Sequence, residues 1–118
     1  MKLKHLKKAH NALSEMILKS KTLPKGTTFF MNAAHCCAFA ILQGERWNSY
    51  KVDDLFGLPN LSEQLNTDIE NLFLGEPAYW KDPYKVTPKQ WRKKANKVLK
   101  TLAKKISKKE FAKTAKAQ

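Results

Sequence analysis

Residues 87–106 constrain the fold more than any other stretch of the sequence. Thr87, Pro88 and Gln90 combine an N-cap hydroxyl, a proline at the first helical position and a glutamine three residues after the cap. At 100° per residue, the apolar side chains that follow share one face, and four lysines share the opposite face. The apolar set is Trp91, Ala95, Val98, Leu99, Leu102 and Ile106, and the lysines are Lys93, Lys97, Lys100 and Lys104. The pattern predicts a helix with one packing face and one lysine row.

Residues 2–20 show the same kind of periodicity and predict a second amphipathic helix. Shorter helices are predicted at residues 33–42, 52–56 and from about 60 or 62 to 73 or 74. The helix at 33–42 has one polar side chain, His35, so we expect it to be buried at the centre of the fold. The β-branched and aromatic segment 27–31 is the one candidate for a short strand. The predicted fold is therefore mainly α, a small single-domain bundle of about four to five helices with at most one short strand or hairpin.

Two segments are predicted to lie outside the core. Residues 76–86 contain Pro77 and Pro83, which favours a surface loop. Continuing the last helix would place Phe111 among the lysines, and Ser107 with Glu110 forms a second capping box. We therefore predict a break near Ser107, which divides the chain into a compact helical domain at 1–106 and a basic extension at 107–118. That extension is expected to be a short helix or a flexible tail.

Charge is concentrated at the two ends of the 118-residue chain, whose net charge is +13. Residues 1–25 carry +6, residues 26–88 carry −4, and residues 89–118 carry +11 from eleven lysines and one arginine against one glutamate. Clustered cations repel one another and gain when an anionic partner neutralises them. The alternative is a lysine-rich face that is merely solvated. We favour an anionic partner because the charge is clustered.

Several classes of function have no support in the sequence. No apolar run reaches the ~20 residues of a membrane span, and the charged N-terminus does not resemble a secretory signal, so we expect a cytoplasmic protein without membrane contact. The adjacent Cys36 and Cys37, next to His35, lack the spacing of zinc ligands and are expected to be reduced packing residues. The four glycines are too far apart for a phosphate loop. We expect no catalytic residue, no metal and no cofactor, and hence no enzyme.

The strongest candidate site is the lysine-rich C-terminal helix, which could follow a phosphate backbone. Lysine dominates over arginine, so we expect backbone binding without sequence preference. Aromatic residues of the preceding loop could stack on bases or anchor a protein partner. The candidate partner-binding residues are Lys89, Arg92, Lys93, Lys97, Lys100, Lys104, Lys108, Tyr79, Trp80 and Tyr84.

Several features of the chain resemble a known group of proteins and bear on its origin. The chain combines an N-terminal helix, a short aromatic segment, an apolar helix with His35, Cys36 and Cys37, and then Phe56-Gly57-Leu58-Pro59. In these features it resembles an uncharacterised group of small phage and prophage proteins with a Cys-Cys-bearing buried helix. Their cysteine pair is followed by a glycine that Ala38-Phe39 lacks here, and their later Asn-Asp pair is not evident. The resemblance implies a phage origin and a bacterial host, and it transfers no site residue.

Two further hypotheses remain open beside nucleic-acid or nucleoprotein binding. The protein could be a phage-encoded inhibitor of a host defence protein, such as an anti-CRISPR, that acts by protein–protein binding. It could also be a small virion component packed against genome or capsid. The same lysines would serve a nucleic acid or an acidic protein surface, so the sequence does not identify the partner or the oligomeric state.

Overall fold

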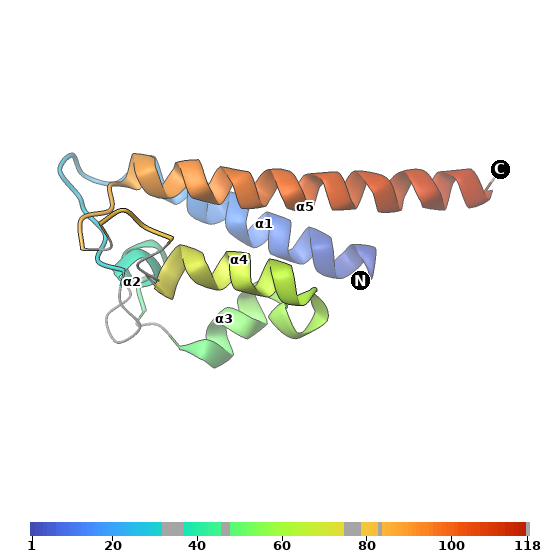
Figure 1. The fold of residues 1–118 in the computed structure, drawn as a ribbon, viewed down its shortest axis with the longest axis horizontal. Helices are drawn as coiled ribbons and strands as arrows, with labels where there is room; N and C mark the ends of the chain where they lie inside the picture. Colours follow the sequence, from blue (N-terminus) through green and yellow to red (C-terminus); the bar gives the residue numbers. More distant parts are fainter. Residues whose placement is uncertain (32–36, 46–47, 75–78, 83, 118) are drawn as a thin grey trace.

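The computed structural model describes residues 1–31, 37–45, 48–74, 79–82 and 84–117, and these residues form a helical bundle (Figure 1). Five α-helices follow in chain order: α1 (Leu3–Ser20), α2 (Cys37–Gln43), α3 (Ser49–Phe56), α4 (Glu63–Leu74) and α5 (Pro88–Ala117). A short 3₁₀ turn, Leu58–Asn60, connects α3 with α4. The prediction of a mainly α bundle with four to five helices is confirmed.

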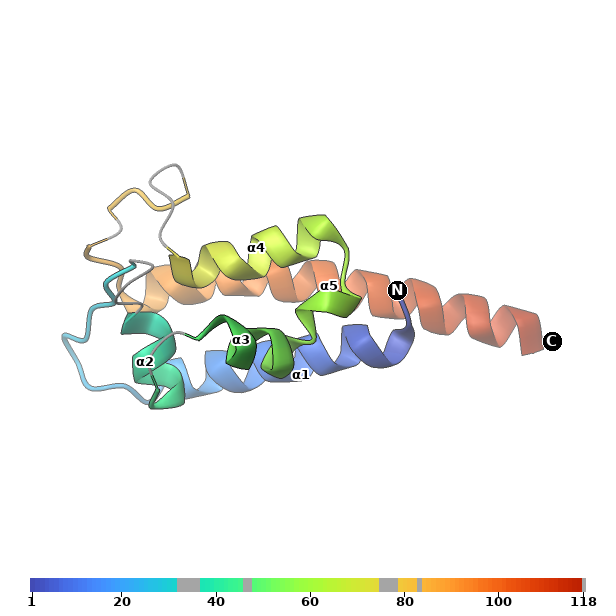
Figure 2. The same ribbon diagram turned by 90° about the horizontal axis from the view of Figure 1, so that it is seen from below.

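The two long helices, α1 and α5, lie side by side and run antiparallel (Figures 1 and 2). Each contributes its predicted apolar face to the core, and the side chains of Leu6, Leu13, Met16, Trp91 and Leu102 are fully buried. Arg92 Nη1 donates hydrogen bonds to the backbone oxygen of Ser20 at 3.0 Å and to its Oγ at 3.3 Å. A cation at this place also suits the partial negative charge of the α1 C-terminus.

An aromatic cluster joins the shorter helices to α5. The ring of Phe73 in α4 lies 5.8 Å from Phe39, 5.9 Å from Phe56 and 6.1 Å from Trp91, measured between centroids. Trp91 Nε1 donates to the backbone oxygen of Leu72 at 3.0 Å. The last carbonyls of a helix have no hydrogen-bond partner within it. The indole therefore gives the Leu72 carbonyl a donor that it would otherwise lack in the protein interior.

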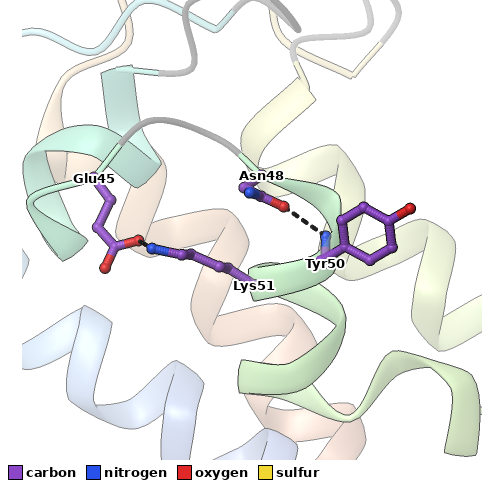
Figure 3. A network of polar contacts seen from close by, with 4 residues as sticks. All are labelled: Glu45, Asn48, Tyr50 and Lys51. Atoms are coloured by element: carbon purple, nitrogen blue, oxygen red, sulfur yellow. Dashed lines mark hydrogen bonds and ion pairs between the residues drawn. The ribbon is translucent and has the colours of Figure 1, made fainter.

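The start of α3 is fixed by a local cap, visible in Figure 3. Asn48 Oδ1 accepts a hydrogen bond from the Tyr50 backbone nitrogen at 2.9 Å, and Lys51 forms an ion pair with Glu45. The helix ends at Phe56 and is capped by Gly57, whose φ of 65° is the left-handed conformation that glycine adopts without strain. The Tyr50 side chain is 84% exposed.

The segment predicted as a possible strand makes only one β-bridge among the described residues. Phe29 pairs with Val86 through two backbone hydrogen bonds, with N···O distances of 2.6 and 3.1 Å. Here the expectation of a surface loop at 76–86 is wrong in part, because Val86 and Trp80 are buried in the core. The bridge and these two side chains hold the end of the loop against α5.

The predicted break near Ser107 is wrong: α5 continues through Ser107 to Ala117. Residues 89–117 contain neither glycine nor proline, and the lysines, alanines and glutamate around Ser107 favour a helix, so propensity outweighs the second capping box. Glu110 Oε1 pairs instead with Lys7 Nζ at 3.0 Å. The last turns of α5 extend beyond the other helices (Figures 1 and 2).

The predicted central helix at 33–42 is described only from Cys37 onward. Ala38, Phe39 and Leu42 are buried, but Ile41 is 41% exposed, so this part is not buried on all sides. The predictions made for His35 and Cys36 lie outside the described residues. None of the described helices is long and apolar enough to cross a lipid bilayer.

Candidate anion-binding groove

A groove of about 430 Å³ runs between the N-terminal half of α5 and the end of the loop that precedes it. Its basic lining consists of Lys93, Lys94 and Lys97 from α5 and of Lys81 and Lys85 from the loop. Asp82 lines it as well, so the charged side chains of the groove that the structure describes sum to +4. Such a concentration of one sign attracts anions and lowers the energy of an anion bound there.

The loop residues reach the groove because the loop is tied to α4 and to the segment around Phe29. Trp80 Nε1 donates to the backbone oxygen of Asn71 at 3.0 Å, which anchors the loop to the last turn of α4. Val86 is held by its bridge to Phe29. Between these two anchors, Asp82 Oδ1 accepts from the backbone nitrogen of Tyr84 at 3.0 Å in a tight turn. The lysines on either side of that turn are both exposed.

Lys94 is the most constrained cation of the groove. Its Nζ lies 4.2 Å from the centroid of the Tyr79 ring and 5.4 Å from the Trp80 ring, both within cation–π range. Burial lowers the pKa of Lys94, and the positive charges of Lys97 and Lys93 lower it further. A bound anion would offset both effects, because its negative charge favours the protonated form of the ammonium group.

The three predicted aromatic residues have different surroundings. Trp80 is 3% exposed, and its indole N–H is already bonded to α4. Tyr79 packs edge-on against Trp80 at 5.3 Å, and burial raises the pKa of its phenol, with a further contribution from Asp68. Tyr84 is 58% exposed and lies 4.9 Å from the Phe30 ring. The rings of Tyr79 and Trp80 therefore contact the Lys94 ammonium group, whereas the ring of Tyr84 remains accessible to solvent.

The predicted basic residues divide into three groups. Lys93 and Lys97 line the groove. Lys100, Lys104 and Lys108 are exposed and continue the same face of α5 beyond it. Lys89 and Arg92 line a second hollow of about 400 Å³ beside the end of α1 and do not line the groove. Arg92 is engaged there by Ser20, so the structure does not bring it to the groove.

Sequence reasoning missed three lysines that line the groove: Lys81, Lys85 and Lys94. Lys94 lies off the centre of the predicted lysine row, and its contact with Tyr79 required the folded loop. Lys81 and Lys85 flank a turn that no sequence period describes. In the sequence, Lys81 directly follows Trp80 and Lys85 directly follows Tyr84. This pairing of aromatic and basic residues was the one sequence signal that the loop contributes to a binding site.

Within the described part of the chain, no group of three or more His, Cys, Asp or Glu side chains could hold a metal ion. Comparisons with known proteins gave no relative: no protein-family model, curated protein or solved structure matches this chain. The function is therefore inferred from the charges and geometry of the groove and the lysine row.

Proposed function

We propose that this protein binds the sugar–phosphate backbone of nucleic acid, free or within a nucleoprotein, through the groove and the lysine row of α5. We further propose that it acts in the cytoplasm of a bacterial cell as a phage-type protein without catalytic activity. The observation that carries the proposal is the convergence of five lysines from two separate segments on one groove, continued along α5 by Lys100, Lys104 and Lys108.

The spacing of the lysine row supports contact with a polymer rather than with one small anion. Lys108 extends the lysine row by one turn, and from Lys93 to Lys108 the helix rises about 22 Å at 1.5 Å per residue. One strand of a duplex carries a phosphate about every 3.4 Å along the axis, so the row spans about six phosphates. Neutralising them releases condensed counterions, which provides affinity that salt weakens.

Two observations support binding without sequence preference. Base edges are read most often by arginine or by amide side chains, and the one arginine of α5 is bonded to Ser20. The basic side chains that line the groove and form the row are all lysines, which act as mobile point charges. We therefore expect similar affinity for oligonucleotides of unrelated sequence.

The proposal is tested by neutralising four lysines of the row together, Lys93→Gln, Lys97→Gln, Lys100→Gln and Lys104→Gln. Affinity for a labelled oligonucleotide, measured by fluorescence anisotropy at low salt, should fall at least tenfold, and the salt dependence should lose about three units of slope. The matched control changes to glutamine four exposed lysines at the N-cap of α1 and within it, Lys2, Lys4, Lys8 and Lys19, and alters the net charge equally. Equal losses in both variants would show attraction by net charge alone and would contradict a defined site.

An inhibitor that binds a host protein would behave differently. A tagged protein recovered from bacterial lysate should lose its co-purifying proteins when nuclease is added, because nucleic acid bridges them. A stoichiometric protein complex that survives nuclease treatment would contradict the proposal and favour the inhibitor.

A further inference from the structure

Phe111 lies near the C-terminal end of α5, and its side chain is 77% exposed. At 100° per residue it shares the face of Lys93, Lys100 and Lys104, directly opposite the buried Leu102. The helix carries this ring at a fixed place about 10 Å along the axis from Lys104 and about 4.5 Å from Lys108. Phe111 is thus an aromatic end to the lysine row.

The core does not need this side chain. The packing face of α5 is complete with Trp91, Ala95, Val98 and Leu102, and Ile106 is already only half-buried. An exposed phenylalanine on a helix surface loses the free energy that burial of its ring would provide, and a polar residue would serve the helix equally well. A partner that covers the ring would recover that free energy.

The charges around Phe111 define what the partner must offer. Lys104, Lys108, Lys109 and Lys113 are exposed along this part of α5, and Glu110 is paired with Lys7. The same end of α5 in a second copy of the chain would bring lysines against lysines. An anionic polymer with flat apolar faces fits both the ring and its surroundings, and nucleic acid combines phosphates with nucleobases in this way.

We propose that Phe111 stacks on an unpaired base of single-stranded nucleic acid whose backbone follows the lysine row. This inference rests on the proposed function and adds the class of strand to it. In an intact duplex the base faces are covered by their neighbours, and inserting a ring between base pairs requires unstacking. In a single strand the faces are open, and stacking on an aromatic side chain tolerates any base.

The test compares the binding of wild type, Phe111→Ala and Phe111→Trp to two labelled probes. One is an oligothymidine of about 12 nucleotides, a length typical of the sites bound by single-strand-binding domains. The other is a blunt duplex of the same length. Phe111→Ala should weaken single-strand binding about tenfold, with an unchanged salt dependence, because no charge is lost. Phe111→Trp should retain the affinity. Binding to the duplex should change less than twofold in both variants.

The matched control is Tyr50→Ala, which removes an aromatic side chain of comparable exposure from α3 and should leave both affinities unchanged. Unchanged single-strand affinity of Phe111→Ala, with wild type bound, would overturn the stacking inference and leave the proposed function standing. An equal loss on the duplex would also overturn it. Failure of wild type to bind either oligonucleotide would instead overturn the proposed function, and the stacking inference with it.

Discussion

At the scale of single residues, the two described tryptophans have structural roles that their positions in the sequence do not reveal. Both indole N–H groups donate to carbonyls in the last turn of α4, Trp80 to Asn71 and Trp91 to Leu72. Trp91 thereby fixes α5 to the core, and Trp80 fixes the loop that supplies Lys81 and Lys85 to the groove. The Trp80 hydrogen bond therefore helps to position the loop lysines of the groove.

Trp91→Phe should lower the free energy of unfolding by about 2 to 3 kcal/mol. The substitution leaves the buried carbonyl of Leu72 without its donor and removes ring volume from a fully buried position. Urea denaturation followed by circular dichroism measures the change, with Tyr84→Phe as a control expected within about 0.5 kcal/mol of wild type. A Trp91→Phe variant as stable as wild type would show that the indole hydrogen bond contributes nothing.

At the scale of helices, much of the structure could be predicted because the signals are local. The capping box at the start of α5 forms as expected: Thr87 Oγ1 accepts from Gln90 N at 3.1 Å, and Gln90 Oε1 accepts from Thr87 N at 3.0 Å. The apolar faces of α1 and α5 also follow from their periodicity. The break near Ser107 failed because a capping signal without a glycine or proline does not end a strong helix.

Because α5 is continuous through Ser107, a proline at that position should disrupt the end of the helix. Ser107→Pro removes the 107 N–H from the helix and clashes with the preceding turn, at a local cost of about 3 kcal/mol. Residues 107–113 are exposed, so we expect the helical signal in circular dichroism to fall while the urea midpoint barely changes. Ser107→Ala, as the control, should keep the full signal. An unchanged signal in Ser107→Pro would mean that the end of α5 is not helical in solution.

At the scale of the whole molecule, the projecting end of α5 makes the protein elongated. Its extents are 52 × 26 × 26 Å, and its radius of gyration is 15.0 Å, against about 13.5 Å for a compact domain of this length. The lysine row and Phe111 extend over about 27 Å, about half of the longest dimension. The lysine row could be predicted from the period of one helix. The groove could not, since it requires the bridge between Phe29 and Val86 to bring the loop to α5.

The measurement that tests the central claim most directly is the salt dependence of wild-type affinity for two oligonucleotides of unrelated sequence. If the groove and the row neutralise about six phosphates, log K should fall against log salt with a slope of about −4 for both oligonucleotides when they are single-stranded. A slope shallower than about −1, or affinity for only one of the two sequences, would contradict an electrostatic interface that follows the backbone.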